Sequence, residues 1–198
     1  MLLLLLLGSC SNIYKETLAH RKDYKEGFIL DPRSPLTKEN LGDLDFFKPT
    51  QAGKVEAVFK HTPEKAPFEM LTYSGVTRTY RKYGEAKFVM GGDSMSLSIY
   101  QNHSLLSNPM YEDYLFLPFK DMTNDVSTYG GGRYLNISKK DVDDGMVNID
   151  FNKAYNPWCA FSDGFNCPIP PSENHLGIAI EAGEKKYKGP VKKAAVAH

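Results

Sequence analysis

The sequence predicts a mainly β protein, an antiparallel sandwich or barrel-like sheet with a short N-terminal helix. Three observations support this fold class. Segments with period-two alternation recur at short spacing from residue 54 onward, glycine and proline punctuate the stretches between them, and no helical segments alternate with them. Because the chain has 198 residues, of which 41% are hydrophobic, it can bury one sizeable core. We therefore expect a single β-rich domain over residues 31–189.

The N-terminus reads MLLLLLLGSC, six leucines followed by small residues and Cys10. This pattern is typical of the apolar region and cleavage site of an export signal, although the run is short and no basic residue precedes it. It also resembles a bacterial lipobox, in which Cys10 is acylated and becomes the mature N-terminus. We therefore interpret residues 1–10 as a signal peptide and expect a lipoprotein of the cell envelope, anchored in the membrane with its domain on the periplasmic or surface face. The alternative is a frayed apolar terminus of a cytosolic protein.

Residues 11–30 are rich in helix formers, and one stripe of the expected helix carries Ile13, Thr17, Leu18, Arg21 and Tyr24, with charges elsewhere. This pattern predicts a short amphipathic helix between the anchor and the domain. A turn-rich connector with Asp31-Pro32 and Ser34-Pro35 comes next. At the other end, residues 190–198 are expected to form a disordered tail.

The strands are predicted from alternation between apolar and polar residues. In the first one, Val55, Ala57 and Phe59 alternate with lysine and glutamate, which is the signature of a half-buried strand. Ser74-Gly75 marks a hairpin between two of the strands. The predicted strands cover residues 54–62, 68–74, 76–83, 85–92, 94–102, 111–121, 131–137, 145–151 and 176–185.

The charge balance excludes one class of partner. The chain has 24 basic and 24 acidic residues, so it lacks the net basic charge that a dedicated nucleic-acid-binding protein needs to displace counterions. The sequence also contains no recognised catalytic, nucleotide-binding or calcium-binding motif, and it predicts no cofactor and no metal site.

Arg133 follows three glycines in the stretch TYGGGRYL. A strand rather than a helix follows this loop, so the glycines indicate a bulge or a close backbone approach rather than a phosphate-binding loop. An arginine positioned by a strand is suited to recognising a carboxylate or a phosphate. The competing interpretation is an internal ion pair with Asp121, Asp150 or Glu184.

Cys159 and Cys167 remain once Cys10 is assigned to the anchor. In an exported protein such a pair predicts a disulfide, which closes a short loop here. Two alternatives stay open: a metal site or free structural thiols, and a reactive thiol for which His175 is the only nearby base.

Several polar residues gather between positions 150 and 185 and form, with Arg133, a candidate ligand-binding site. General acid–base chemistry would need two such groups in a cleft, whereas the competing interpretation is a hydrogen-bonded brace for a long loop. The candidate residues are Arg133, Asp150, Asn152, Asn156, Asn174, Glu184 and Lys185.

The strings TYGGGRYL, DFNKAYNPWCAFS, CPIPPSEN and IEAGEK, together with SPL, GDLDFF and LFLPFKDMTND upstream, resemble the prokaryotic family known as domain of unknown function 1684. The resemblance covers residues 33–185, and an extra glycine before Arg133 departs from the family pattern. It implies no established activity, but it agrees with export because members often carry lipoprotein signals. The family's motif positions fall here on Asp121, Thr123, Tyr129, Arg133, Asp150, Asn152, Asn156, Cys159, Cys167, Asn174, Glu184 and Lys185.

Three functions follow as hypotheses. The first is a lipid-anchored binding module that takes a small polar, anionic or carbohydrate-like ligand near the cysteine loop. The second is a hydrolase or thiol-dependent enzyme that uses Asp150 with Glu184, or a cysteine of the 159–167 pair with His175. The third is a structural envelope lipoprotein without a ligand.

Overall fold

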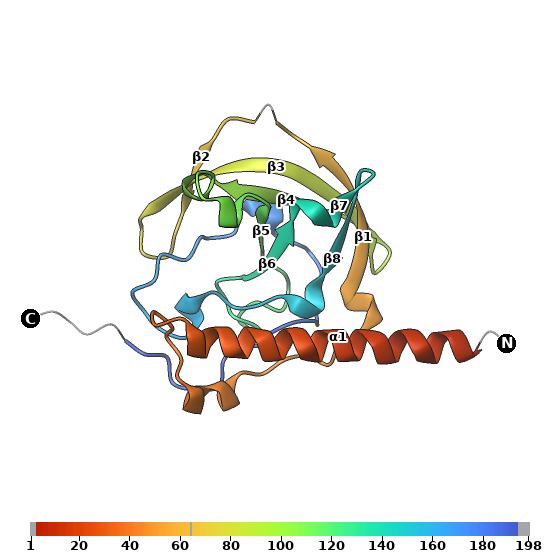
Figure 1. The fold of residues 1–198 in the computed structure, drawn as a ribbon, viewed down its shortest axis with the longest axis horizontal. Helices are drawn as coiled ribbons and strands as arrows, with labels where there is room; N and C mark the ends of the chain where they lie inside the picture. The colour runs from red at the N-terminus through yellow and green to blue at the C-terminus, as the bar shows by residue number, and fades with distance from the viewer. Residues whose placement is uncertain (1–2, 64, 194–198) are drawn as a thin grey trace, which may run out of the picture.

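The computed structural model describes residues 3–63 and 65–193, with side chains from Asn12 onward. The first two residues of the expected signal peptide and residues 194–198 of the expected disordered tail lie outside the described residues. One long helix, α1, runs beneath a curved sheet, and its N-terminal part projects past the sheet (Figure 1). The elements are α1 (Leu3–Leu30), η1 (Lys38–Asp43), η2 (Gln51–Gly53), β1 (Lys54–His61), β2 (Phe68–Leu71), β3 (Thr77–Met90), β4 (Asp93–Asn102), η3 (His103–Leu105), η4 (Pro109–Tyr111), β5 (Tyr114–Phe119), β6 (Arg133–Ser138), η5 (Lys139–Asp141), β7 (Val142–Asp143), β8 (Met146–Asp150), η6 (Phe151–Lys153), η7 (Trp158–Ala160) and η8 (Ser172–Asn174), where η denotes a 3₁₀ helix.

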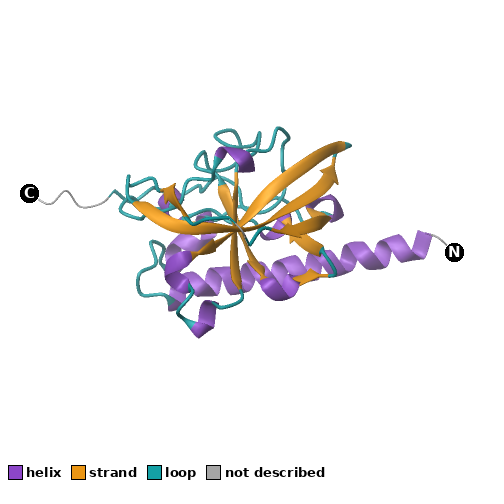
Figure 2. Cartoon of the chain, turned by 90° about the horizontal axis from the view of Figure 1, so that it is seen from above, coloured by secondary structure: helices purple, strands orange, loops and turns teal. Residues whose placement is uncertain are grey.

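The eight strands form one sheet in the order β6-β5-β4-β3-β1-β8-β7, with β2 added to β3. Each pairing between neighbouring strands is antiparallel. The sheet curves but does not close into a barrel, since β6 and β7 are its two ends. Seen from above, the strands fan out strongly, as the right-handed twist of a β-sheet requires (Figure 2). The predicted mainly β, antiparallel fold class is thus confirmed.

The register of the sheet follows from the alternation in the sequence. In β1, Ala57 and Phe59 are buried, whereas Glu56 and Lys60 on the opposite face are exposed. β3 joins two segments that were predicted as separate strands, and its register shifts beside Gly84. A Cβ atom on Gly84 would lie 2.2 Å from the Phe59 ring, so the close packing of β1 against β3 requires glycine at this position.

The central strands carry apolar side chains on both faces. Leu115 and Leu117 of β5 are fully buried in the main core, together with residues such as Ile99 and Ile149. Phe116 points to the other face and joins a second buried cluster, which consists of Met70, Tyr80, Tyr100, Phe116 and Tyr134. Since both faces are apolar, both must be covered. β2 and the segment that carries the cysteines cover the second face.

α1 begins at Leu3 rather than near residue 11, because leucine favours the helical conformation and the apolar run continues the predicted helix. Its buried stripe contains Ile13, Thr17 and Phe28. The Phe28 ring meets Phe161 edge to face at 5.5 Å between centroids, which fixes the helix against the cysteine-containing segment. Among the described residues, no helix is both long and apolar enough to cross a membrane.

The strand predicted over residues 176–185 is wrong. Among the described residues of this segment, only Glu184 forms an isolated bridge, to Phe46, and the rest is irregular. The carbonyl groups of Ile180, Ala182 and Glu184 are occupied by a single arginine side chain instead of a neighbouring strand. The short strand β7 was not predicted, because two residues are too few to show alternation.

Candidate functional site

Arg133 is fully buried at the start of β6 and is the centre of a polar cluster. Its Nη2 donates to Asp121 Oδ2 at 2.8 Å and to the Ile180 carbonyl at 2.9 Å, and its Nη1 donates to the Ala182 carbonyl and, at 3.3 Å, to that of Glu184. Burial lowers the pKa of Arg133, and the negative charge of Asp121 partly offsets that effect. Of the three acids considered as ion-pair partners, Asp121 forms the salt bridge.

Asp121 is itself saturated with hydrogen bonds. Its Oδ1 accepts from the Thr123 hydroxyl at 2.5 Å, from the Thr123 backbone N–H at 2.8 Å and from the Ile180 N–H at 3.2 Å. A buried ion pair with this many additional bonds is the arrangement in which the attraction offsets the cost of desolvation. Arg133 and Asp121 therefore brace the segment around Ile180.

Glu184 is fully buried beside α1. Its Oε2 accepts from the Tyr24 hydroxyl at 2.9 Å and from the Asn156 N–H at 2.8 Å. Its Oε1 has no hydrogen-bond partner among the described residues. Burial is the largest influence and raises the pKa of Glu184 to about 7, while the bonds from Asn156 and Tyr24 act in the opposite direction. Glu184 thus joins the helix to the C-terminal segment.

The three candidate asparagines are also buried and bonded to backbone. Asn152 exchanges two hydrogen bonds with Thr50, and Asn156 donates to the Lys185 carbonyl at 2.8 Å. Asn174 accepts from the Ser98 N–H at 2.7 Å and donates to the carbonyls of Ser98 (2.8 Å) and Pro118 (2.7 Å).

The position of Asn174 has a simple physical explanation. Proline has no N–H to donate to the ladder between β4 and β5, so an amide side chain that offers both a donor and an acceptor fills the gap at Pro118. The three asparagines therefore brace the backbone in this fold. This is the hydrogen-bonded brace that the sequence analysis set against a ligand-binding role.

The other two candidate residues lie nearer the surface. The Asp150 side chain is 10% exposed and lies 3.9 Å from the Lys153 ammonium, and Lys185 is half-buried, 3.8 Å from Asp45. Asp150 borders a cleft of about 560 Å³ between the two ends of the curved sheet. This cleft has three lysines and three aspartates, so its charges compensate one another. It is lined by Lys54, Leu135, Asn136, Ile137, Lys140, Asp141, Asp143, Asn148, Asp150 and Lys153.

Cys159 and Cys167 form a disulfide with a Cα–Cα distance of 6.2 Å. Neither sulfur is then a free thiol. The Nε2 of His175 lies 3.1 Å from the Pro170 carbonyl, so its partner is backbone. No group of three or more His, Cys, Asp or Glu side chains that could hold a metal occurs in the described part of the chain.

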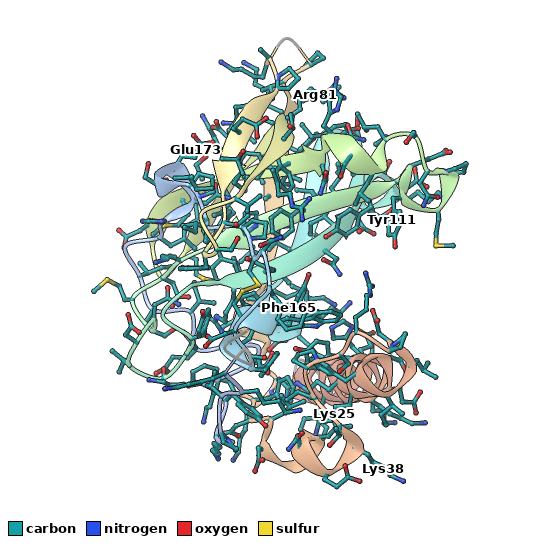
Figure 3. All side chains as sticks on the ribbon, turned by 90° about the vertical axis from the view of Figure 1, so that its left-hand side faces the viewer. Lys25, Lys38, Arg81, Tyr111, Phe165 and Glu173 are labelled. Atoms are coloured by element: carbon teal, nitrogen blue, oxygen red, sulfur yellow. A yellow bond between two sulfur atoms is a disulfide. The ribbon has the colours of Figure 1, made fainter. Side chains whose placement is uncertain are left out.

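The disulfide loop forms one wall of a pocket that the sequence analysis missed. The pocket has a volume of about 310 Å³ and lies on the aromatic face of the sheet, where Trp158 and Phe165 meet edge to face at 5.1 Å between centroids. Figure 3 shows Phe165 beside the disulfide, under the strands of the sheet. The lining residues are Tyr80, Asn102, Leu105, Tyr114, Phe116, Tyr134, Tyr155, Pro157, Trp158, Phe165, Asn166, Cys167 and Pro168.

The tyrosines of this aromatic pocket are held in place by hydrogen bonds. Tyr114 and Tyr155 both donate to Asn136 Oδ1, at 3.2 and 2.7 Å, and Tyr134 donates to the Pro168 carbonyl. Burial raises the pKa of Tyr80 to about 12, so its hydroxyl stays neutral at physiological pH. All thirteen described residues that line the pocket are uncharged.

A signal for this pocket was present in the sequence. Tyr100, Phe116 and Tyr134 occupy the positions that alternate with the inner-core residues of β4, β5 and β6, so these strands are apolar on both faces. Such strands predict a second covering layer. They do not predict whether that layer leaves a hollow, because this depends on the path of the loop above them.

The comparisons with known proteins concern the family and the fold. Residues 39–185 match the family model described as "Protein of unknown function (DUF1684)". The chain is similar to the solution NMR structure of an uncharacterized protein from Haloarcula marismortui, with 30% sequence identity and a TM-score of 0.68 over 90% of this chain and 96% of that chain. No curated protein matches the sequence.

Proposed function

The chain belongs to the DUF1684 family of proteins of unknown function, and from this premise we propose that it is a binding module for a small, neutral, carbohydrate-like ligand, anchored to the cell envelope through acylated Cys10. The observation that carries the proposal is the uncharged aromatic pocket beside the disulfide loop. The buried candidate residues Arg133, Asn152, Asn156, Asn174 and Glu184 are not among the residues that line this pocket, so the proposal gives them a structural role.

The composition of the pocket favours a neutral ring over an anion. A pyranose ring presents C–H groups on its faces, which pack on aromatic rings, and hydroxyls around its edge, which bond to amides and phenols. Trp158 and Phe165 offer the aromatic surface, and Asn102 and Asn166 offer amides. An anionic ligand would need a positive group, and none of the described lining residues has one.

The dimensions of the site agree with a small ligand. A volume of about 310 Å³ is at the lower end of the range for small-molecule pockets, so one or two sugar rings would fill it. The disulfide closes the loop that carries Phe165, directly after Trp158, which lowers the entropy lost when the ligand binds.

The enzyme hypothesis has less support. Cys159 and Cys167 are bonded to each other, and Asp150 and Glu184 belong to separate hydrogen-bond groups, around Asn152 and Tyr24 respectively. The third hypothesis, a structural envelope lipoprotein without a ligand, would be favoured if no compound bound in the following experiment.

The tryptophan provides a reporter for the test. Trp158 is the only tryptophan of the chain and lines the pocket, so its fluorescence can be followed while neutral mono- and disaccharides, uronic acids and sugar phosphates are added. We expect a saturable change with one or more neutral sugars and none with the anionic compounds. A saturable change with anionic sugars alone would contradict the proposed ligand class.

Matched variants show whether the signal arises in the pocket. Phe165→Ala removes an aromatic wall while keeping the reporter, and we expect it to weaken binding about tenfold. Tyr14→Ala is the control, since Tyr14 is an exposed aromatic residue on α1. Equal affinities for the two variants would place the binding site elsewhere.

The anchoring is tested separately. Mass spectrometry of the protein purified from a bacterial membrane should find acyl groups on Cys10 at the mature N-terminus, and Cys10→Ala should release the protein from the membrane. An unprocessed and unmodified N-terminus would rule out the anchor and leave the ligand proposal unaffected.

A further inference from the structure

A second hollow of about 510 Å³ lies between α1 and η1, beside the buried stripe of the helix. Its floor is apolar: Leu18 and Ile29 are 44% and 52% exposed, and Leu41 and Phe46 are partly buried beside them. We call this hollow the helix groove. It is lined by Leu18, Arg21, Lys22, Lys25, Glu26, Ile29, Lys38, Leu41 and Phe46.

The helix groove continues an exposed stripe along α1. At 100° per residue, positions 14, 18, 21, 22, 25 and 29 fall within one arc of the helix surface. Tyr14, Leu18 and Ile29 are exposed apolar residues of this stripe, and Arg21, Lys22 and Lys25 are its cations. An apolar stripe with basic residues is the pattern of a helix that lies in a membrane interface.

The charges of the groove are not balanced within it. Its lining has four cations and one carboxylate, although the whole chain has a formal net charge of zero. Lys22 pairs with Glu26 at 3.7 Å, whereas Lys25 and Lys38 have no ion-pair partner among the described residues. Figure 3 shows Lys25 on α1 and Lys38 on the neighbouring η1, near each other on the same side of the molecule. The groove therefore combines an apolar floor with uncompensated positive charge.

We infer that the helix groove is a docking surface for an anionic phospholipid bilayer. Phospholipid offers both complementary parts: its acyl chains and glycerol region meet Leu18, Ile29 and Phe46, and its phosphates meet Lys25 and Lys38. A lysine near an anionic bilayer contributes a factor of about five to binding. The surface is distinct from the aromatic pocket and does not require the ligand proposed for it.

The path of α1 agrees with this occupant. The helix is uninterrupted from Leu3 to Leu30, so residue 18 lies about 12 Å along the axis from residue 10. The inference extends the proposed anchoring of Cys10, because a rigid helix that starts at the anchor keeps the groove within reach of the same membrane. The groove would then orient the domain, while the acyl chains would hold it.

The test uses the full chain with Cys10→Ala, so that acyl chains do not contribute. Cosedimentation is measured with vesicles of phosphatidylcholine alone and with vesicles of equal parts phosphatidylcholine and phosphatidylglycerol. We expect binding to the anionic vesicles that weakens as salt is added. The Lys25→Glu/Lys38→Glu variant should bind them at least tenfold more weakly, and the control Lys60→Glu/Lys87→Glu, which changes two lysines of the sheet, should bind as the parent does.

The outcomes separate this inference from the other proposals. Equal binding by the groove variant and the control would overturn it, as would equal binding to both kinds of vesicle, which would indicate insertion of the leucine run. A groove variant that dissociates a dimer without changing vesicle binding would identify a second copy of the chain as the occupant and also overturn it. The Trp158 titration and the mass of the N-terminus do not depend on these results.

Discussion

The Tyr24 hydroxyl donates a hydrogen bond of 2.9 Å to Glu184 Oε2, across 160 residues of sequence. Through this bond the N-terminal helix is attached to the last buried segment of the chain. Because Glu184 is fully buried and its pKa is raised to about 7, the stability of the domain is coupled to the protonation of this carboxyl group.

The free energy of unfolding should fall as the pH rises from about 4.5 to about 7. In this window Glu184 is protonated in the folded state and ionised in the unfolded state, so folding takes up a proton. The stabilisation is complete below the unfolded pKa and is lost as the pH passes the folded pKa, with a total effect of about 3 kcal/mol. Urea unfolding of the wild type and of Glu184→Gln, followed across this window, measures the difference.

Glu184→Gln should show a flatter pH dependence, because glutamine does not titrate. Glu56→Gln is the matched control, since Glu56 is exposed on β1. A Glu184→Gln profile that stays parallel to the wild type would assign the pH dependence to other groups.

Arg133→Met should destabilise the domain by about 3–5 kcal/mol, because it leaves the Asp121 carboxylate buried without its charge partner. The additional change Asp121→Asn should recover part of this loss. Chemical denaturation compares both with Arg81→Met, in which a half-buried arginine paired with Gln101 is changed. If Arg133→Met were as stable as Arg81→Met, the buried ion pair would not be needed for the stability of the fold.

Asn174→Asp should cost at least about 3 kcal/mol at neutral pH. Aspartate cannot donate to the carbonyls of Ser98 and Pro118, and it would bring a charge into a fully buried position. Asn166→Asp, at an exposed amide, should leave the unfolding midpoint nearly unchanged. Similar midpoints for the two variants would contradict the role of Asn174 as a brace.

Replacing both cysteines of the disulfide by serine should lower the stability by about 2.5 kcal/mol, the entropy expected for a loop of eight residues. It should also weaken ligand binding, because the loop that carries Phe165 loses its constraint. Thermal unfolding with and without a reductant provides the check. The reductant should lower the unfolding temperature of the wild type and leave that of the double variant unchanged.

The sequence predicted the strands well where one face is apolar and the other polar, as in β1. It did not predict the irregular path of residues 176–185, because these residues alternate like a strand and the partner that occupies their carbonyls, Arg133, lies far away in sequence. The sequence identified the polar residues as a group. It did not predict whether their side chains bond to backbone groups inside the fold or face a ligand, because an asparagine in either role looks the same in sequence. The disulfide was predicted from the two cysteines that remain beside Cys10, together with the expectation of export, and it is present.

The guanidinium of Arg133 has a consequence for the order in which the molecule is assembled. Its carbonyl acceptors at Ile180 and Glu184 follow it by 47 and 51 residues, so a growing chain presents Arg133 and its charge partner Asp121 long before it presents these acceptors. The hydrogen bonds of this buried side chain are therefore completed only when nearly the whole polypeptide has been made. A chain that ended before residue 180 would leave the guanidinium with Asp121 as its hydrogen-bond partner.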